Sequence, residues 1–166
     1  MRIALYVVGG LVALVLAIVV IGYLLPQSHT ASREITVAAP PDKVFALIGT
    51  PSDYPRWRSD VDSVEVLAPE SGKDRFREIG DNGALLMRVE ERLPDSRLVT
   101  VIADTTLPFG GKWTYELTPS GTGTRLRITE NGEVYNPVFR FMSRFVFGHT
   151  ASMDKYLADL EKAIRR

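Results

Sequence analysis

The sequence contains no cysteine and no excess of either charge. The lack of thiols excludes disulfides, thiolate metal sites and a cysteine nucleophile. Lys and Arg number 20, as do Asp and Glu, so no basic surplus is present to neutralise phosphates, and nucleic acid is not an expected partner. The two histidines, His29 and His149, lack metal-ligand spacing, and neither a glycine-rich phosphate loop nor a G-x-S-x-G motif occurs. We therefore expect no metal and no cofactor.

Charge is also missing from the whole stretch between Ile3 and Leu25. At about 1.5 Å per residue, a helix of this length covers roughly 35 Å, enough to cross a hydrocarbon core of about 30 Å. A cleaved signal peptide is the alternative, but its apolar region is shorter and precedes a small-x-small site. Here the run is longer, and His29 stands two positions before Ala31. These features favour an uncleaved transmembrane anchor at 1–25, a polar linker at 26–31 and one domain at 32–166.

The charges that flank the anchor indicate its orientation. The N-terminal amine and Arg2 precede it, whereas the residues from Pro26 to Ser32 carry no fixed charge. The positive-inside tendency then predicts a single-pass protein with a cytoplasmic N-terminus and the domain on the outer side, periplasmic or extracellular. A six-residue linker reaches only about 20 Å, so the domain is expected to stay near the membrane surface.

The remaining sequence predicts an α+β domain. Proline at the start and Gly49 at the end predict a helix over 40–49, with a second short helix after Thr50. Alternating apolar residues bounded by turn residues predict about seven antiparallel strands; they are expected near 33–37, 61–67, 74–79, 84–93, 97–103, 113–117 and 124–133.

A helical pattern replaces the strand pattern near Asn136, which is a plausible N-cap followed by proline. Apolar residues then recur every three or four positions to the C-terminus, which predicts one helix of about eight turns that covers the sheet. Gly148 is the position where this helix would bend most easily.

Four segments carry a resemblance to a known family; they are 33–45 (REITVAAPPDKVF), 54–58 (YPRWR), 123–130 (GTRLRITE) and 156–160 (YLADL). With the order of elements, they resemble the START-like or helix-grip superfamily (SRPBCC), specifically its polyketide cyclase/dehydrase-like branch. The resemblance spans about residues 32–165. It implies a curved sheet that grips the C-terminal helix around a cavity for an apolar ligand. It does not imply one function, because such folds serve lipid carriers, hormone receptors, cyclases and chaperone-activating domains.

Two titratable residues are candidates for that cavity. Glu130 shares a strand face with Leu126 and Ile128, and a carboxylate there would be desolvated and suited to acid–base work or to binding a polar ligand head. A structural pairing with Arg88 or Arg127, or an outward register, is the alternative. His149 lies on the apolar helical stripe, where an imidazole could act as a base or a hydrogen-bond partner; otherwise it caps carbonyls near the bend or faces solvent.

The other candidates are apolar or aromatic. Trp57, Trp113 and Tyr115 line the pocket or belong to the core, and Met87 lies on the apolar face of its strand. Around Met142 and Phe145 the helix is apolar nearly all round. That cluster is a piece of core, a pocket wall or an apolar lip that touches the bilayer.

Three functions remain open. The first is a membrane-anchored binding module for a hydrophobic small molecule or lipid. The second is a cyclase- or dehydratase-like enzyme in which Glu130 or His149 moves a proton, although no two titratable groups are evidently held together in the expected cavity. The third is a protein-interaction domain without a ligand, which a cavity filled by its own side chains would favour.

Overall fold

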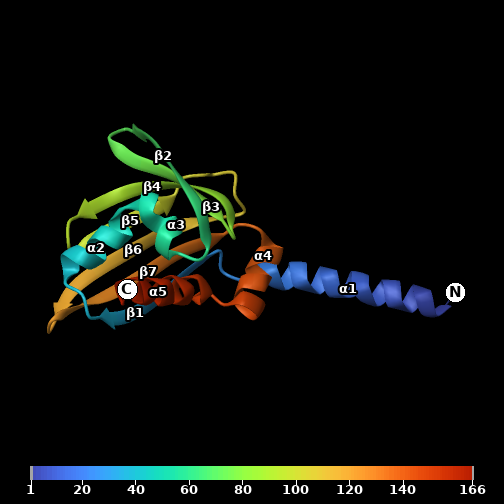
Figure 1. Ribbon diagram of the computed structural model, residues 1–166. Helices are drawn as coiled ribbons and strands as arrows, with labels where there is room; N and C mark the ends of the chain where they lie inside the picture. The colour runs from blue at the N-terminus through green and yellow to red at the C-terminus, as the bar shows by residue number, and fades with distance from the viewer. Residues whose placement is uncertain (1, 166) are drawn as a thin grey trace.

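The computed structural model describes residues 2–165 and shows a strongly curved antiparallel sheet of seven strands (Figure 1). The strands lie in the order β1-β7-β6-β5-β4-β3-β2, so that β1 and β2 form the two edges. Their bounds are β1 (Ser28–Val37), β2 (Val61–Glu70), β3 (Lys73–Gly80), β4 (Gly83–Leu93), β5 (Arg97–Ile102), β6 (Phe109–Ser120) and β7 (Gly123–Val134). The α+β class and the number of strands are those expected.

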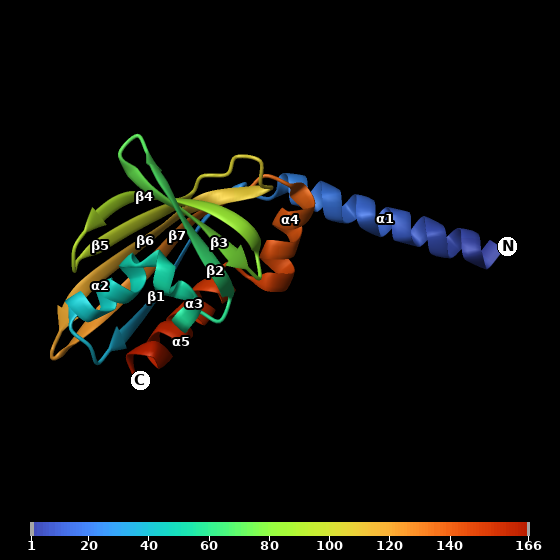
Figure 2. The ribbon, with the colours of Figure 1, turned by 45° about the horizontal axis from the view of Figure 1, so that its top comes forward.

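Three short helical elements connect the edge strands β1 and β2: α2 (Pro41–Gly49), η1 (Pro51–Asp53) and α3 (Tyr54–Trp57). They lie over the concave face together with the C-terminal helix α5 (Ala151–Ile164), as both views show (Figures 1 and 2). The core lies between these helices and the sheet. Its most completely buried members are Val44, Ile48, Leu98, Leu126, Ile128, Met153, Tyr156 and Leu160.

The first strand begins earlier than expected. β1 starts at Ser28, and its residues pair with β7 from Ser28 opposite Glu133 to Val37 opposite Thr124. Residues 28–31, expected to lie in the linker, are therefore part of the sheet. Polar side chains are common in an edge strand. Residues 28–31 are held there by backbone pairing with β7, which the local hydrophobic pattern does not reveal.

The single long C-terminal helix was a wrong prediction. The segment is divided into α4 (Pro137–Met142), the π-helical η2 (Ser143–Phe147) and α5. Gly148 has φ +75°, a left-handed conformation that stops the helix where a bend was expected. The N-cap at Asn136 is confirmed, because its side-chain oxygen accepts hydrogen bonds from the amides of Val138 and Phe139 at 2.9 and 3.2 Å.

The N-terminal helix α1 (Arg2–Leu24) projects away from the domain (Figure 1). It is long and apolar enough to cross a membrane, and none of its most apolar window is buried by the rest of the chain. The same properties fit a signal sequence. Its C-terminal part meets the domain, where Gly22 packs against Pro137 of α4.

Candidate functional site

A cavity of about 330 Å³ lies between the concave face of the sheet and the start of the C-terminal helical segment. Its middle is apolar and aromatic, lined by Phe76, Met87, Ile102, Phe109 and Trp113 from β3, β4, β5 and β6. The volume falls at the lower end of the range for small-molecule sites, about 300–1,000 Å³. The two ends of the cavity differ from the middle because each carries charged or titratable side chains.

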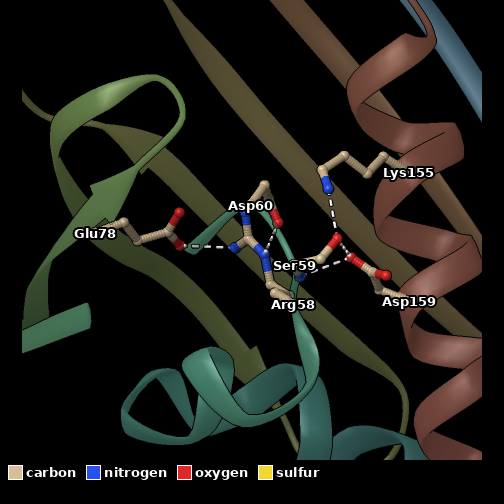
Figure 3. A network of polar contacts seen from close by, with 6 residues as sticks. All are labelled: Arg58, Ser59, Asp60, Glu78, Lys155 and Asp159. Carbon is tan, nitrogen blue, oxygen red and sulfur yellow. Dashed lines mark hydrogen bonds and ion pairs between the residues drawn. The ribbon is translucent and has the colours of Figure 1, made fainter. Parts of the chain in front are cut away.

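The inner end is built around Arg58, which follows α3 directly. Its guanidinium donates to Asp60 at 2.7 and 3.2 Å and to Glu78 of β3 at 3.0 Å (Figure 3). The guanidinium carbon also lies 5.1 Å from the ring centres of Tyr54 and Tyr156. All three charged side chains are nearly buried, with 11–15% of their surface exposed.

This burial sets the electrostatics of the inner end. Desolvation raises the pKa of Glu78, although the Arg58 charge opposes the shift. Desolvation acts in the same direction on Asp60, but its hydrogen bonds with Arg58 outweigh it and lower the pKa of that carboxyl. Desolvation also acts to lower the pKa of Arg58, but the hydrogen bond to Asp60 and the charge of Glu78 outweigh it and raise that pKa. The guanidinium is therefore a permanent cation, with its donors directed at two carboxylates.

A second set of contacts holds the backbone beside Arg58 to α5. The amide and hydroxyl of Ser59 donate to Asp159 at 2.8 and 2.7 Å, and Lys155 donates to the same hydroxyl (Figure 3). The charged cluster is thus supported from both sides, by β3 and by α5.

The other end of the cavity holds both histidines. The imidazoles of His29 and His149 are stacked, with ring centres 4.0 Å apart and 26° between their planes. Nε2 of His29 lies 3.7 Å from Oε1 of Glu130. Titratable groups from β1, β7 and the loop before α5 therefore meet at one point, which corrects the expectation that none are held together.

Close packing in the sheet places these groups. His29 is opposite Gly132 in the β1–β7 register, and a Cβ on Gly132 would lie 2.3 Å from the His29 ring. A larger residue at this position would push the imidazole aside. Glu130 is opposite Trp113 in β6 and lines the cavity.

Burial shifts the protonation of this cluster. Desolvation raises the pKa of Glu130, and an interaction with the Trp113 side chain offsets part of the shift. Desolvation lowers the pKa of His29, helped by the neighbouring charge of His149, and lowers the pKa of His149, helped by Arg144. Imidazoles of lowered pKa beside a carboxyl of raised pKa have proton affinities closer to one another than in water, which favours proton transfer between such groups.

Five of the eight residues expected at the site line the cavity: Met87, Trp113, Tyr115, Glu130 and His149. The other three do not. Trp57 packs edge-on against Tyr54 and Tyr156 and borders a separate outer groove. Met142 is half-buried outside the cavity lining, and Phe145 is 59% exposed, because the break at Gly148 turns α4 and η2 away from the direction of α5.

The residues that sequence reasoning missed are Arg58, Glu78 and His29. Glu78 had a usable signal, since it shares strand parity with the buried Phe76. Arg58 lies in one of the segments that carry the family resemblance, but nothing local shows that its charge is buried. His29 fell in the expected linker.

Comparison with known proteins agrees with this architecture. The model of the family described as polyketide cyclase/dehydrase and lipid transport matches residues 28–165. The chain belongs to this family. The match begins at the first residue of β1 and includes every residue of both cavity ends, whereas α1 lies outside it.

One protein of related sequence and two solved structures of similar fold resemble the chain. A putative polyketide cyclase of Streptomyces halstedii is 37% identical over 101 residues, which is 56% of this chain and 92% of the relative. A START superfamily protein from Mycobacterium smegmatis has the same fold, with a TM-score of 0.66 and 16% identity over 82% of this chain and 97% of that one. The di-domain ARO/CYC StfQ from the steffimycin biosynthetic pathway superposes with a TM-score of 0.65 and 14% identity, over 82% of this chain and 50% of that one.

Proposed function

We propose that the protein binds a hydrophobic small molecule or lipid in the cavity and does so at a membrane to which α1 anchors it. The observation that carries this proposal is the open volume of about 330 Å³ with an apolar, aromatic middle. Apolar surface that leaves water there contributes about 25 cal/mol per Å² to binding. The buried Arg58 cluster offers a polar partner for one end of the ligand, so an amphipathic molecule fits best.

Filling the cavity tests the proposal. Met87→Trp places a bulky aromatic ring in the middle, and Val66→Trp makes the same kind of change at a site that is 68% exposed on β2. We expect the unchanged chain and the Val66 variant to bind N-phenyl-1-naphthylamine, and the Met87 variant to bind it at least about tenfold more weakly, a loss of roughly 1.4 kcal/mol. Native mass spectrometry of the extracted protein would show whether lipid is retained. No dye binding and no retained lipid would contradict the proposal.

Anchoring rests on the length and composition of α1, and the charges around it support a cytoplasmic N-terminus with the domain on the outer side. A reporter enzyme that is active only outside the cytoplasm, fused to the C-terminus, should be active, and the chain should stay with the membrane after carbonate extraction. Recovery of a shortened chain in the soluble fraction would instead show that α1 is a cleaved signal.

A second candidate function is catalysis of a cyclase or dehydratase type, which the cluster of His29, His149 and Glu130 favours. Such reactions need a base that removes a proton from carbon and an acid that protonates oxygen. A carboxyl of raised pKa beside neutral imidazoles can supply both. The relative named as a putative polyketide cyclase makes a polyketide chain the first substrate class to test.

This candidate has its own test. If the cluster is catalytic, Glu130→Gln and His149→Ala should each reduce turnover of a polyketide substrate about 10²-fold or more, with dye binding retained. Turnover that survives both substitutions would remove the idea. A third role, protein interaction with no ligand, has less support because the cavity is open.

A further inference from the structure

The surface of α4 and η2 is unusually apolar for a water-exposed segment. Val138, Phe139, Phe145 and Val146 are 40%, 51%, 59% and 58% exposed. The sequence from 137 to 147 contains no acidic residue. We call the four exposed side chains the apolar rim. An exposed cluster of large apolar residues marks a surface that another apolar phase covers.

The rim is held beside the end of α1. A Cβ on Gly22 would lie 2.0 Å from the carbonyl oxygen of Pro137, so the two helices touch backbone to backbone. Arg140 of α4 is buried and donates to the carbonyl of Leu25 at 3.0 Å and to that of Tyr135 at 2.9 Å. Both views show α4 next to the domain end of α1 (Figures 1 and 2).

This arrangement determines the depth of the rim once α1 lies in a bilayer. A helix of 23 residues is only slightly longer than a hydrocarbon core about 30 Å thick, so its last turn lies at the boundary between acyl chains and headgroups. The rim then lies at that boundary too. The exposed Arg144 between the rim residues can extend toward lipid phosphates while the phenylalanines face the acyl chains.

The same segment borders the cavity. Phe139 of α4, Ser143 of η2 and His149 after the break all line it. Phe139 is exposed and Ser143 and His149 are half-exposed, whereas Tyr54, Phe76 and Glu78 at the inner end are buried. The cavity therefore opens beside the rim and next to the end of α1.

We propose that the apolar rim is inserted in the lipid bilayer, so that the cavity opens toward the membrane and exchanges its ligand with it directly. The proposal rests on the anchoring of α1 under the proposed function, and it names the lipid surface as the partner of the rim. The rim lies directly beside the end of α1, so the bilayer that surrounds the helix also covers the rim. This continuity identifies the lipid surface as the partner. A second copy of the chain is the competing occupant.

The cysteine-free sequence makes a direct test possible. Single variants Phe145→Cys and Val146→Cys are labelled with the environment-sensitive fluorophore NBD in the full chain, which is reconstituted in phosphatidylcholine–phosphatidylglycerol vesicles with doxyl-labelled lipids. Ala13→Cys, in the middle of α1, reports anchoring, and Val66→Cys, exposed on β2, is the aqueous control. We expect quenching of about twofold at the rim, between the values at positions 13 and 66.

The outcomes separate the two proposals. If the label at position 13 is quenched but the labels at the rim are quenched no more than the label at position 66, the rim proposal is overturned and the anchor stands. No quenching at position 13 would overturn both. A rim signal that depends on the protein-to-lipid ratio would assign the surface to a second copy and also overturn the proposal.

A functional readout uses the two rim residues that do not line the cavity. Phe145→Asp with Val146→Asp should slow transfer of N-phenyl-1-naphthylamine from vesicles to the protein about tenfold, because charge disfavours insertion. The amount of dye bound at equilibrium should stay the same, and Val66→Asp should change neither. If the double variant takes up the dye as fast as the unchanged chain, direct exchange with the membrane is overturned. If the unchanged chain binds no dye at equilibrium, the proposed function itself is contradicted.

Discussion

The two ends of the cavity hold charge in different ways. At the inner end, Arg58, Asp60 and Glu78 are nearly buried, and both carboxylates are paired with the guanidinium. At the mouth, His29, His149 and Glu130 lie close together, but the only polar contact between their side chains in the described chain is long, 3.7 Å. A buried charge is stable only when it is fully paired, whereas a partly exposed group can change its protonation. The inner end is therefore suited to structure and to a fixed polar contact, and the mouth to proton exchange.

The largest expected effect comes from removing the cation at the inner end. Arg58→Met leaves Glu78 and Asp60 without their partner, and we expect a loss of about 3–5 kcal/mol in the free energy of unfolding. Arg56→Met is the matched control, because Arg56 is 81% exposed in its pair with Asp53 and should contribute less than about 1 kcal/mol. Urea unfolding of the detergent-solubilised chain measures both. Equal losses would show that the inner cluster does not depend on pairing.

A smaller effect is expected at the mouth from Gly132→Ala. The added Cβ meets the His29 ring, and the resulting overpacking should cost about 1–2 kcal/mol. In the His29→Ala background the same change should cost much less, because the obstructing ring is gone. A double-mutant cycle measures this coupling. Additive losses would mean that His29 does not occupy the space over Gly132.

The two ends should also respond differently to pH. The pKa values of His29 and His149 are lowered in the folded chain, so the unfolded chain binds more protons as pH falls below about 6.5. Their contribution to stability is complete above this pH and is lost toward the lower folded values. His29→Gln with His149→Gln should therefore flatten the decline in unfolding midpoint just below pH 6.5. If the unfolding midpoint of the double variant declines as steeply as that of the unchanged chain, groups other than the two histidines cause the decline.

The carboxyl at the mouth should act in the opposite direction and weakly. The raised pKa of Glu130 means that its favourable contribution is complete below about pH 4.5 and is lost as pH rises through the folded value. Glu130→Gln should then raise the unfolding midpoint slightly at pH 7 and leave it unchanged at pH 4. A lower midpoint at pH 7 would show that the carboxylate form is stabilised by its neighbours.

Much of the fold could be predicted because it depends on short-range patterns. Alternation predicted the sheet, and the same parity directed Glu130 into the cavity. Proline and Asn136 marked the helix starts, and Gly148 marked the break. The unbroken C-terminal helix was a wrong prediction because a stripe of period 3.6 continues across Gly148 on both sides, so periodicity alone does not reveal the turn.

The site was less predictable because its residues meet only across the sheet. His29 belongs to an edge strand that β7 pairing extends, and its position over Gly132 depends on register. Arg58 and Glu78 come from different elements, and the burial of each depends on the other. Three expected cavity residues were misplaced for a related reason: Trp57, Met142 and Phe145 are apolar, and their sequence does not show whether core, cavity or an exposed rim receives them.

By itself the sequence determined an apolar N-terminal helix followed by a seven-stranded α+β domain, because hydrophobic period, turn residues and the absence of charge act over a few residues. Only the tertiary structure decided that two histidines and a glutamate meet at the mouth, that an arginine is paired in the interior, and that α4 turns toward α1. Each of these depends on strand register and close packing between segments distant along the chain, which no local pattern encodes.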